Sequence, residues 1–146
     1  MQLSLLLHLP HDAAVVPVAR RLLTGTLNAL GAERECVRDI AVALSEACTN
    51  VLRHADAHDD FEVTAAIDDS LCVLEVVDRG SGFDATLVPG EVAADSEAGR
   101  GLRLMRSLLD AIDFENHPRG GTVAHLYKRL VWDPSALARR VASREA

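Results

Sequence analysis

A chain of 146 residues has the length of one ordinary domain, and its 49% of hydrophobic residues supply enough material for a single core. Aromatic residues make up only 3% and the net charge is −7. These values argue against a base-stacking platform for single-stranded nucleic acid, and against direct binding to nucleic acid or to an anionic membrane. An acidic net charge does not exclude binding to a basic protein surface.

Two common kinds of site are excluded by what the sequence lacks. The only lysine is Lys128, and no Gly-Lys-Ser or Gly-Lys-Thr run occurs, so a nucleotide site cannot be a P-loop. The three cysteines are odd in number and widely spaced, which argues against a disulfide framework or a zinc site. We expect Cys36, Cys48 and Cys72 to be small buried residues in a reducing compartment.

The N-terminal segment predicts a strand rather than a secretion signal. Every second residue from Leu3 to Leu9 is leucine, which is typical of a half-buried strand. The segment has no basic start, and His8 and Pro10 interrupt it early. No stretch of the sequence has the length and apolar character of a membrane span, so we expect a cytoplasmic protein.

Two segments with helical spacing follow. The first helix is expected after a cap at residues 11–12 and ends at Gly31, with Arg20 and Arg21 turned outward. The second, longer helix is expected over residues 33–54. The apolar positions are Val15, Val18, Leu22 and Leu23 in the first helix, and Val37, Ile40, Ala41, Leu44, Cys48, Val51 and Leu52 in the second.

The remainder of the chain predicts strands, one further helix and a tail. Apolar residues alternate over 61–67 and run almost continuously over 71–77, which indicates two strands joined by a turn. Residues 86–98 show no period and are expected to form a mobile loop. The other expected elements are a helix over 99–110, strands over 111–116 and 122–130, and a tail over 132–146 with a short helix that starts near Asp133 or Ser135.

The order of these elements predicts the fold class. Adjacent strands joined by short turns imply antiparallel pairs, and helices that come in separate blocks cover one face of a sheet. We therefore expect an α+β two-layer sandwich with a mixed, mostly antiparallel sheet. It forms one domain over residues 1–131, with residues 132–146 as a separate tail.

Glu46 and Asn50 lie four residues apart in the second expected helix, and His54 is one further step along the same face. A carboxylate and an amide in an otherwise apolar stretch need partners. Asn50 offers an oxygen ligand for Mg²⁺, and Glu46 can position or deprotonate a nucleophile. The same spacing also occurs on helix faces that are merely exposed to water.

Asp78, Gly80 and Gly82 directly follow the nearly continuous apolar strand. Glycines let the backbone approach a flat ligand closely, and Asp78 can accept a hydrogen bond from an exocyclic amine such as that of adenine. A tight turn after a strand is the simpler alternative.

Two further glycine segments flank the last elements. Gly99, Arg100, Gly101 and Leu102 open the third helix, where free backbone N–H groups attract phosphates. Thr122 follows two glycines at the start of the final strand and offers a hydroxyl near the sheet end. A hinge and a hairpin turn would explain these segments equally well one at a time.

The order and spacing of these motifs are more specific than any one of them. A helix with Glu-x-x-x-Asn, a strand ending in Asp-x-Gly-x-Gly, a lid-like loop before Gly-x-Gly-Leu, and Gly-Thr before the last strand resemble the GHKL (Bergerat-fold) ATP-binding superfamily. The segment around Glu46 and Asn50, and a first strand and helix with Ala19-Arg20, resemble the anti-sigma-factor serine/threonine kinase family.

The resemblance implies a Bergerat ATP-binding fold and a role for each site residue. Asn50 would coordinate Mg²⁺ and Glu46 would be the general base. Asp78 would bind the adenine amine, helped through water by Thr122. The remaining nucleotide-binding residues implied are His54 near the phosphates, Gly80 and Gly82 beside the base, and Gly99, Arg100, Gly101 and Leu102 in the lid and phosphate-binding turn.

The implied activity is transfer of the γ-phosphate of ATP to a serine or threonine of an anti-sigma-factor antagonist. The implied partners are that antagonist, a sigma factor and a second copy of the chain in a homodimer. Glu91, Asp95 and Glu97 give the lid an unusual acidity, so a non-catalytic ATP-binding module that docks on another regulator stays open as an alternative. The detached ATP-binding half of a histidine kinase system is a third hypothesis.

Overall fold

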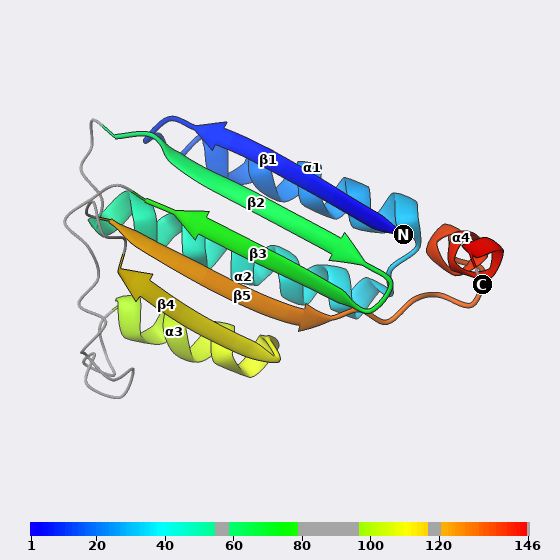
Figure 1. The fold of residues 1–146 in the computed structure, drawn as a ribbon. Helices are drawn as coiled ribbons and strands as arrows, with labels where there is room; N and C mark the ends of the chain where they lie inside the picture. The colour runs from blue at the N-terminus through cyan, green and yellow to red at the C-terminus, as the bar shows by residue number, and fades with distance from the viewer. Residues whose placement is uncertain (55–58, 79–96, 117–120, 146) are drawn as a thin grey trace.

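The protein is described by a computed structural model that covers residues 1–54, 59–78, 97–116 and 121–145. These residues form an α+β sandwich of two layers, as the sequence predicts (Figure 1). The strands are β1 (Gln2–Leu9), β2 (Phe61–Asp68), β3 (Leu71–Val77), β4 (Ala111–Asn116) and β5 (Thr122–Arg129). The helices are α1 (Val15–Leu30), α2 (Arg34–His54), α3 (Glu97–Leu108) and α4 (Leu137–Glu145).

One sheet forms the first layer, with the strand order β1-β2-β3-β5-β4. Every described pair is antiparallel, so the parallel component expected of a mixed sheet does not occur among these strands. α1, α2 and α3 lie together on one face of the sheet, and α4 lies at the end near the N-terminus (Figure 1). Burial alternates along β2 and β3, because every second side chain of a strand points toward the helices.

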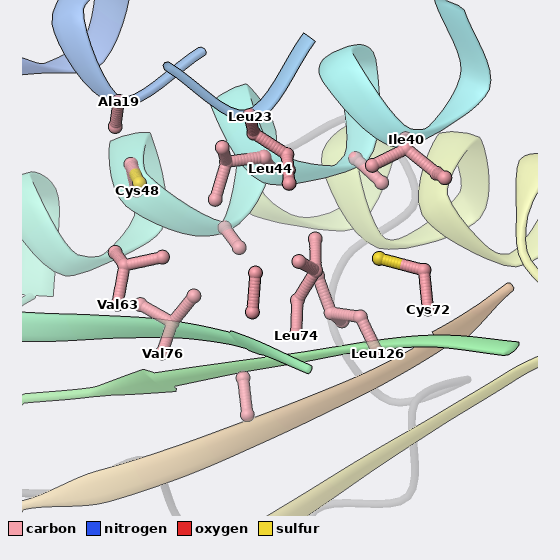
Figure 2. Packing of buried hydrophobic residues seen from close by; sticks show 14 of the residues in the cluster. Ala19, Leu23, Ile40, Leu44, Cys48, Val63, Cys72, Leu74, Val76 and Leu126 are labelled. Carbon is pink, nitrogen blue, oxygen red and sulfur yellow. The ribbon is translucent and has the colours of Figure 1, made fainter. Parts of the chain in front are cut away.

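α2 is the central helix of the second layer, and its predicted apolar face is confirmed. Ile40, Leu44 and Cys48 pack between α1 and the sheet, where they meet side chains such as Leu74 and Val76 (Figure 2). Of the apolar positions predicted for this helix, only Leu52 is less than fully buried. None of the described helices combines the length and the apolar character needed to cross a membrane.

The predicted apolar face of α1 is partly wrong. Val18 and Leu22 are 51% and 49% exposed, and Arg20 is half-buried and donates to Ser45 Oγ at 3.3 Å rather than pointing outward. α1 carries two apolar stripes, and the continuous one at three- and four-residue spacing is the one that packs on α2. The buried residues of this helix are Val16, Ala19, Leu23, Leu27 and Leu30.

The three cysteines are free thiols and are buried, as the sequence predicts. Burial raises the pKa of Cys48 and of Cys72 to about 12, and it raises the pKa of Cys36 as well. Thiols with such pKa values carry almost no thiolate at neutral pH, so these side chains act as small core residues.

The C-terminal tail packs on the junction between α1 and α2. Trp132 pairs with Ala32 in an isolated β-bridge, and its indole Nε1–H donates to the carbonyl of Asp69 at 2.7 Å. The backbone N–H of Asp133 donates to the carbonyl of Gly31 at 2.9 Å. The Asp133 carboxylate accepts hydrogen bonds from Ser135 just before α4, as expected from the sequence.

Gly31 ends α1 in the left-handed conformation, with φ of 91° and close contact to the tail. A Cβ atom at Gly31 would lie 2.6 Å from the Cβ of Ala136 and 2.7 Å from its Cα. We expect Gly31→Ala to lower the free energy of unfolding by about 2–5 kcal/mol, because backbone strain and overpacking add. Urea unfolding measures this change.

Gly25 supplies the matched control, since it lies in the same helix and a Cβ atom at this position would have no other atom within 4 Å. Gly25→Ala is expected to raise the free energy of unfolding by up to about 1 kcal/mol through helix propensity. A lower free energy of unfolding in both variants, or an unchanged value in Gly31→Ala, would contradict the close packing of the tail on Gly31.

Candidate nucleotide-binding site

Glu46 and Asn50 lie one turn apart on α2, where this helix meets the start of α3. Gly101 of α3 is buried against both side chains. A Cβ atom at Gly101 would lie 2.7 Å from Glu46 Oε2 and 4.0 Å from Asn50 Oδ1. Only glycine allows this approach without displacing the carboxylate. The structure thus brings together residues from two motifs that lie far apart in the sequence.

Asn50 Oδ1 is a buried oxygen that accepts no hydrogen bond from the residues that the structure describes. A buried polar atom without a partner is costly, and such atoms often serve a ligand. Amide oxygens are suitable ligands for Mg²⁺, which commonly completes its coordination with phosphates and water. Asn50 therefore fits a magnesium–nucleotide site, and within the described ranges no cluster of three or more His, Cys, Asp or Glu side chains could hold a metal without a nucleotide.

Asp78 and Thr122 lie side by side at one end of the sheet. Asp78 directly follows β3, and Thr122 is the first residue of the neighbouring strand β5. The backbone N–H of Asp78 donates to the carbonyl oxygen of Thr122 at 3.0 Å, which fixes the two residues together. Thr122 is the one polar side chain that is fully buried among the described residues.

A pocket between α2, the sheet and α3 connects Asn50, Asp78 and Thr122, whereas Glu46 and Gly101 are not among its lining residues. Its walls are mostly apolar, with a few polar groups from α2 and from the ends of β3 and β5, as is usual in small-molecule sites. The lining residues are Ala47, Asn50, Val51, His54, Val76, Asp78, Leu102, Phe114, Thr122 and Ala124. Asn50, His54, Asp78, Leu102 and Thr122 were predicted from the sequence to bind nucleotide.

The apolar walls of the pocket were not predicted. Phe114 of β4 faces the helices opposite Ala124 of β5, and Val76 of β3 shares that face. The strand alternation around these residues is visible in the sequence, but it marks them only as core positions. The antiparallel pairing of β4 with β5 was predicted, but the register that sets Phe114 opposite Ala124 and brings it to the pocket was not.

The remaining predicted residues are placed as follows. α3 begins at Glu97, two residues before the expected start, so Gly99 and Gly101 lie in its first turns. Glutamate and alanine favour helix more than glycine does, which extends the helix toward the loop. Gly99 is buried, whereas Arg100 and His54 are exposed. Gly80, Gly82 and most of the expected mobile loop lie outside the described residues.

Comparisons with known proteins agree with this fold. Residues 9–127 match the family model described as a histidine kinase-like ATPase domain. The chain is 30% identical over 127 residues to the serine-protein kinase RsbW of Bacillus subtilis (strain 168), covering 79% of each chain. It is 32% identical to the RsbW of Bacillus cereus (strain ATCC 10987 / NRS 248), covering 79% of this chain and 78% of the relative.

Solved structures share the fold. The structure of the RsbU and RsbW domains of Rv1364c from Mycobacterium tuberculosis matches with a TM-score of 0.66 and 26% identity, over 88% of this chain and 32% of that one. The SiaB-SiaC complex from Pseudomonas aeruginosa matches with a TM-score of 0.61 and 18% identity, over 86% of this chain and 89% of that one, which shows the fold alone.

These matches define the class of protein as a histidine kinase-like ATPase domain of the GHKL superfamily. Within that superfamily, the chain belongs to the anti-sigma-factor serine/threonine kinase family. The resemblance read from the sequence motifs is thereby confirmed.

Proposed function

We propose that the chain is an ATP-dependent serine/threonine protein kinase that phosphorylates an anti-sigma-factor antagonist and sequesters a sigma factor. The observation that carries the proposal is the contact of Gly101 with Glu46 and Asn50, at the edge of a pocket that also holds Asp78 and Thr122. Membership of the family supports the activity, since the RsbW relatives are named serine-protein kinases.

Each site residue receives a role in this proposal. Asn50 Oδ1 would hold Mg²⁺, which would supply charge neutralisation for the phosphates. The Asp78 carboxylate accepts a hydrogen bond from the adenine amine, and the Thr122 hydroxyl, next to it across the sheet end, supports this contact through water. The residues proposed to surround the base and phosphates are Gly80, Gly82, His54, Gly99, Arg100, Gly101 and Leu102.

Glu46 is proposed to be the general base. Its carboxylate lies against Gly101 at the start of α3, beside the residue proposed to hold the metal. From this position it can accept the proton of an incoming serine or threonine hydroxyl as the new phosphate ester bond forms, while the bond from the γ-phosphorus to the bridging oxygen breaks and ADP leaves. The apolar walls of the pocket, formed by residues such as Val51, Val76 and Phe114, exclude water from the adenine ring and orient the nucleotide.

Protein partners and a homodimer are part of the proposal. Leu6 of β1 is 69% exposed, and Val18 and Leu22 of α1 add a second exposed apolar patch. Large exposed apolar side chains often mark protein contacts. We propose that the first strand and helix supply the surface of a cytoplasmic homodimer, and that antagonist and sigma factor bind this assembly.

Phosphotransfer to a protein hydroxyl tests the proposed function. The chain is incubated with Mg²⁺, labelled ATP and an antagonist encoded beside it, and we expect phosphoserine or phosphothreonine on the antagonist. Omission of Mg²⁺ is the control and should abolish transfer. Tight ATP binding without transfer would favour the non-catalytic module, and acid-labile phosphohistidine on a supplied histidine protein would favour the histidine kinase alternative.

A further inference from the structure

Lys128, the only lysine of the chain, occupies a position on β5 that faces the helices. Its ammonium group lies 3.1 Å from Asp39 Oδ2 of α2 and donates a hydrogen bond of 2.6 Å to the carbonyl oxygen of Leu108. Leu108 is the last residue of α3. One side chain of the sheet therefore contacts both helices that border the pocket.

This position is unusual for a charged side chain. Thr122, Ala124 and Leu126 share the inward face of β5, and all three are buried. The side chains of Lys128 and Asp39 are each only 19% exposed. A cation on such a face needs partners, and the C-terminal end of a helix favours positive charge. The Lys128 ammonium group forms an ion pair with Asp39 and a hydrogen bond with the carbonyl oxygen at the end of α3, and these two contacts hold the side chain in place.

α3 is thus joined to α2 near both of its ends. Near its start, Gly101 packs on Glu46 and Asn50. At its end, Lys128 links the carbonyl of Leu108 to Asp39. Because a helix is rigid, a small shift at the end of α3 also moves its first turns. Loss of the Lys128 bridge would therefore change the distance between these turns and the α2 side chains of the site.

The turn between α3 and β4 is secured independently of the Lys128 side chain. The backbone N–H of Asp110 donates to the carbonyl of Tyr127 at 2.9 Å, and the Asp110 carboxylate accepts the backbone N–H of Arg129 at 2.7 Å. Leu102 and Met105 of α3 are buried in the layer between the helices and the sheet. Loss of the Lys128 ammonium is therefore compatible with a folded chain.

We propose that Lys128 is a positioning residue for nucleotide binding, which holds α3 at the correct distance from Glu46 and Asn50 by bridging Leu108 and Asp39. This inference rests on the proposed function, because it concerns the same ATP site. Lys128 is not among the residues that line the pocket.

Lys128→Met tests the inference, since methionine keeps much of the chain length and loses the charge and the hydrogen bonds. We expect the Kd for a non-hydrolysable ATP analogue with Mg²⁺ to rise about tenfold, because small misplacements of binding groups are costly. Lys128→Arg can reform both contacts and should restore the Kd to within about threefold of the original value. Calorimetric titration measures the Kd, and urea unfolding without nucleotide measures stability.

Trp132→Phe is the control for a purely structural effect. It removes the hydrogen bond to the carbonyl of Asp69, in the turn between β2 and β3 that does not line the pocket, and should lower stability without changing the Kd. An unchanged Kd in Lys128→Met would overturn the inference, whatever its stability. Should Lys128→Met fail to fold, Asp39→Asn decides, because it weakens the link to α2 alone; a Kd equal to that of the original chain would then overturn it.

The wild-type titration separates the two proposals. Failure of the unchanged protein to bind the ATP analogue would refute the proposed function and, with it, the positioning role. Tight binding by the unchanged protein together with an unaltered Kd in Lys128→Met, or in Asp39→Asn should Lys128→Met fail to fold, would refute the positioning role alone.

Discussion

Glu46→Gln is expected to lower phosphotransfer to the antagonist by about 10²–10⁴-fold, the usual contribution of a general base. The substitution keeps the shape of the side chain beside Gly101 and removes its negative charge together with its ability to accept a proton. ATP affinity should stay within about twofold, because a group that acts in the transition state adds little to ground-state binding. Single-turnover transfer with labelled ATP and calorimetric binding measure the two quantities.

Glu35→Gln is the matched control for the loss of one negative charge. Glu35 is exposed in the first turn of the same helix, away from the pocket. Its transfer rate should equal that of the unchanged chain. If Glu46→Gln instead loses ATP affinity in proportion to activity, Glu46 is a binding residue and the proposed general base is wrong.

Gly101→Ala is expected to lower phosphotransfer by about 10²-fold, because a displacement of about 1 Å at a reacting group has an effect of that size. The new Cβ would lie 2.7 Å from Glu46 Oε2, so this carboxylate must move. The carboxylate is the flexible end of a side chain, so its movement need not destabilise the fold. The free energy of unfolding should rise by up to about 1 kcal/mol, because alanine favours a helix more than glycine does.

A second substitution tests whether the close approach to Glu46 causes this loss. Glu46→Asp shortens the side chain by one methylene group, so it should weaken the effect of Gly101→Ala when both are present. A double-mutant cycle on the transfer rate measures the coupling between the two positions. Transfer by Gly101→Ala within about twofold of the original rate would show that the contact has no functional role.

Most of the fold follows from local patterns in the sequence. The alternation in Phe61–Asp68 and the helical spacing of Ile40, Leu44 and Cys48 are properties of short segments, and both were predicted correctly. The choice of face on α1 was not predictable in this way. Val18 and Leu22 are as apolar as the buried Leu23 and Leu27, and only the packing of α1 on α2 distinguishes them.

The site was predicted in its motifs but not in its contacts. The spacing of Glu46 and Asn50 within one helix is local, so their shared face could be foreseen. Their proximity to Gly101 depends on how α2 and α3 pack, and the bridge from Lys128 to Leu108 depends on the inward register of β5. A lone lysine in the sequence carries no signal of such a contact. The order of the motifs predicted the site only through the resemblance to a known family.

The central claim is that Asn50, Asp78, Gly101 and Thr122 form one site for Mg²⁺-ATP. Titration of the isotope-labelled chain with ATP and Mg²⁺, followed by backbone amide NMR, tests it most directly. We expect saturable shifts at Asp78, Gly101 and Thr122, and little change at Gly25 and Ala142, which lie outside the pocket. Absence of saturable shifts, or shifts confined to residues away from the pocket, would contradict the claim.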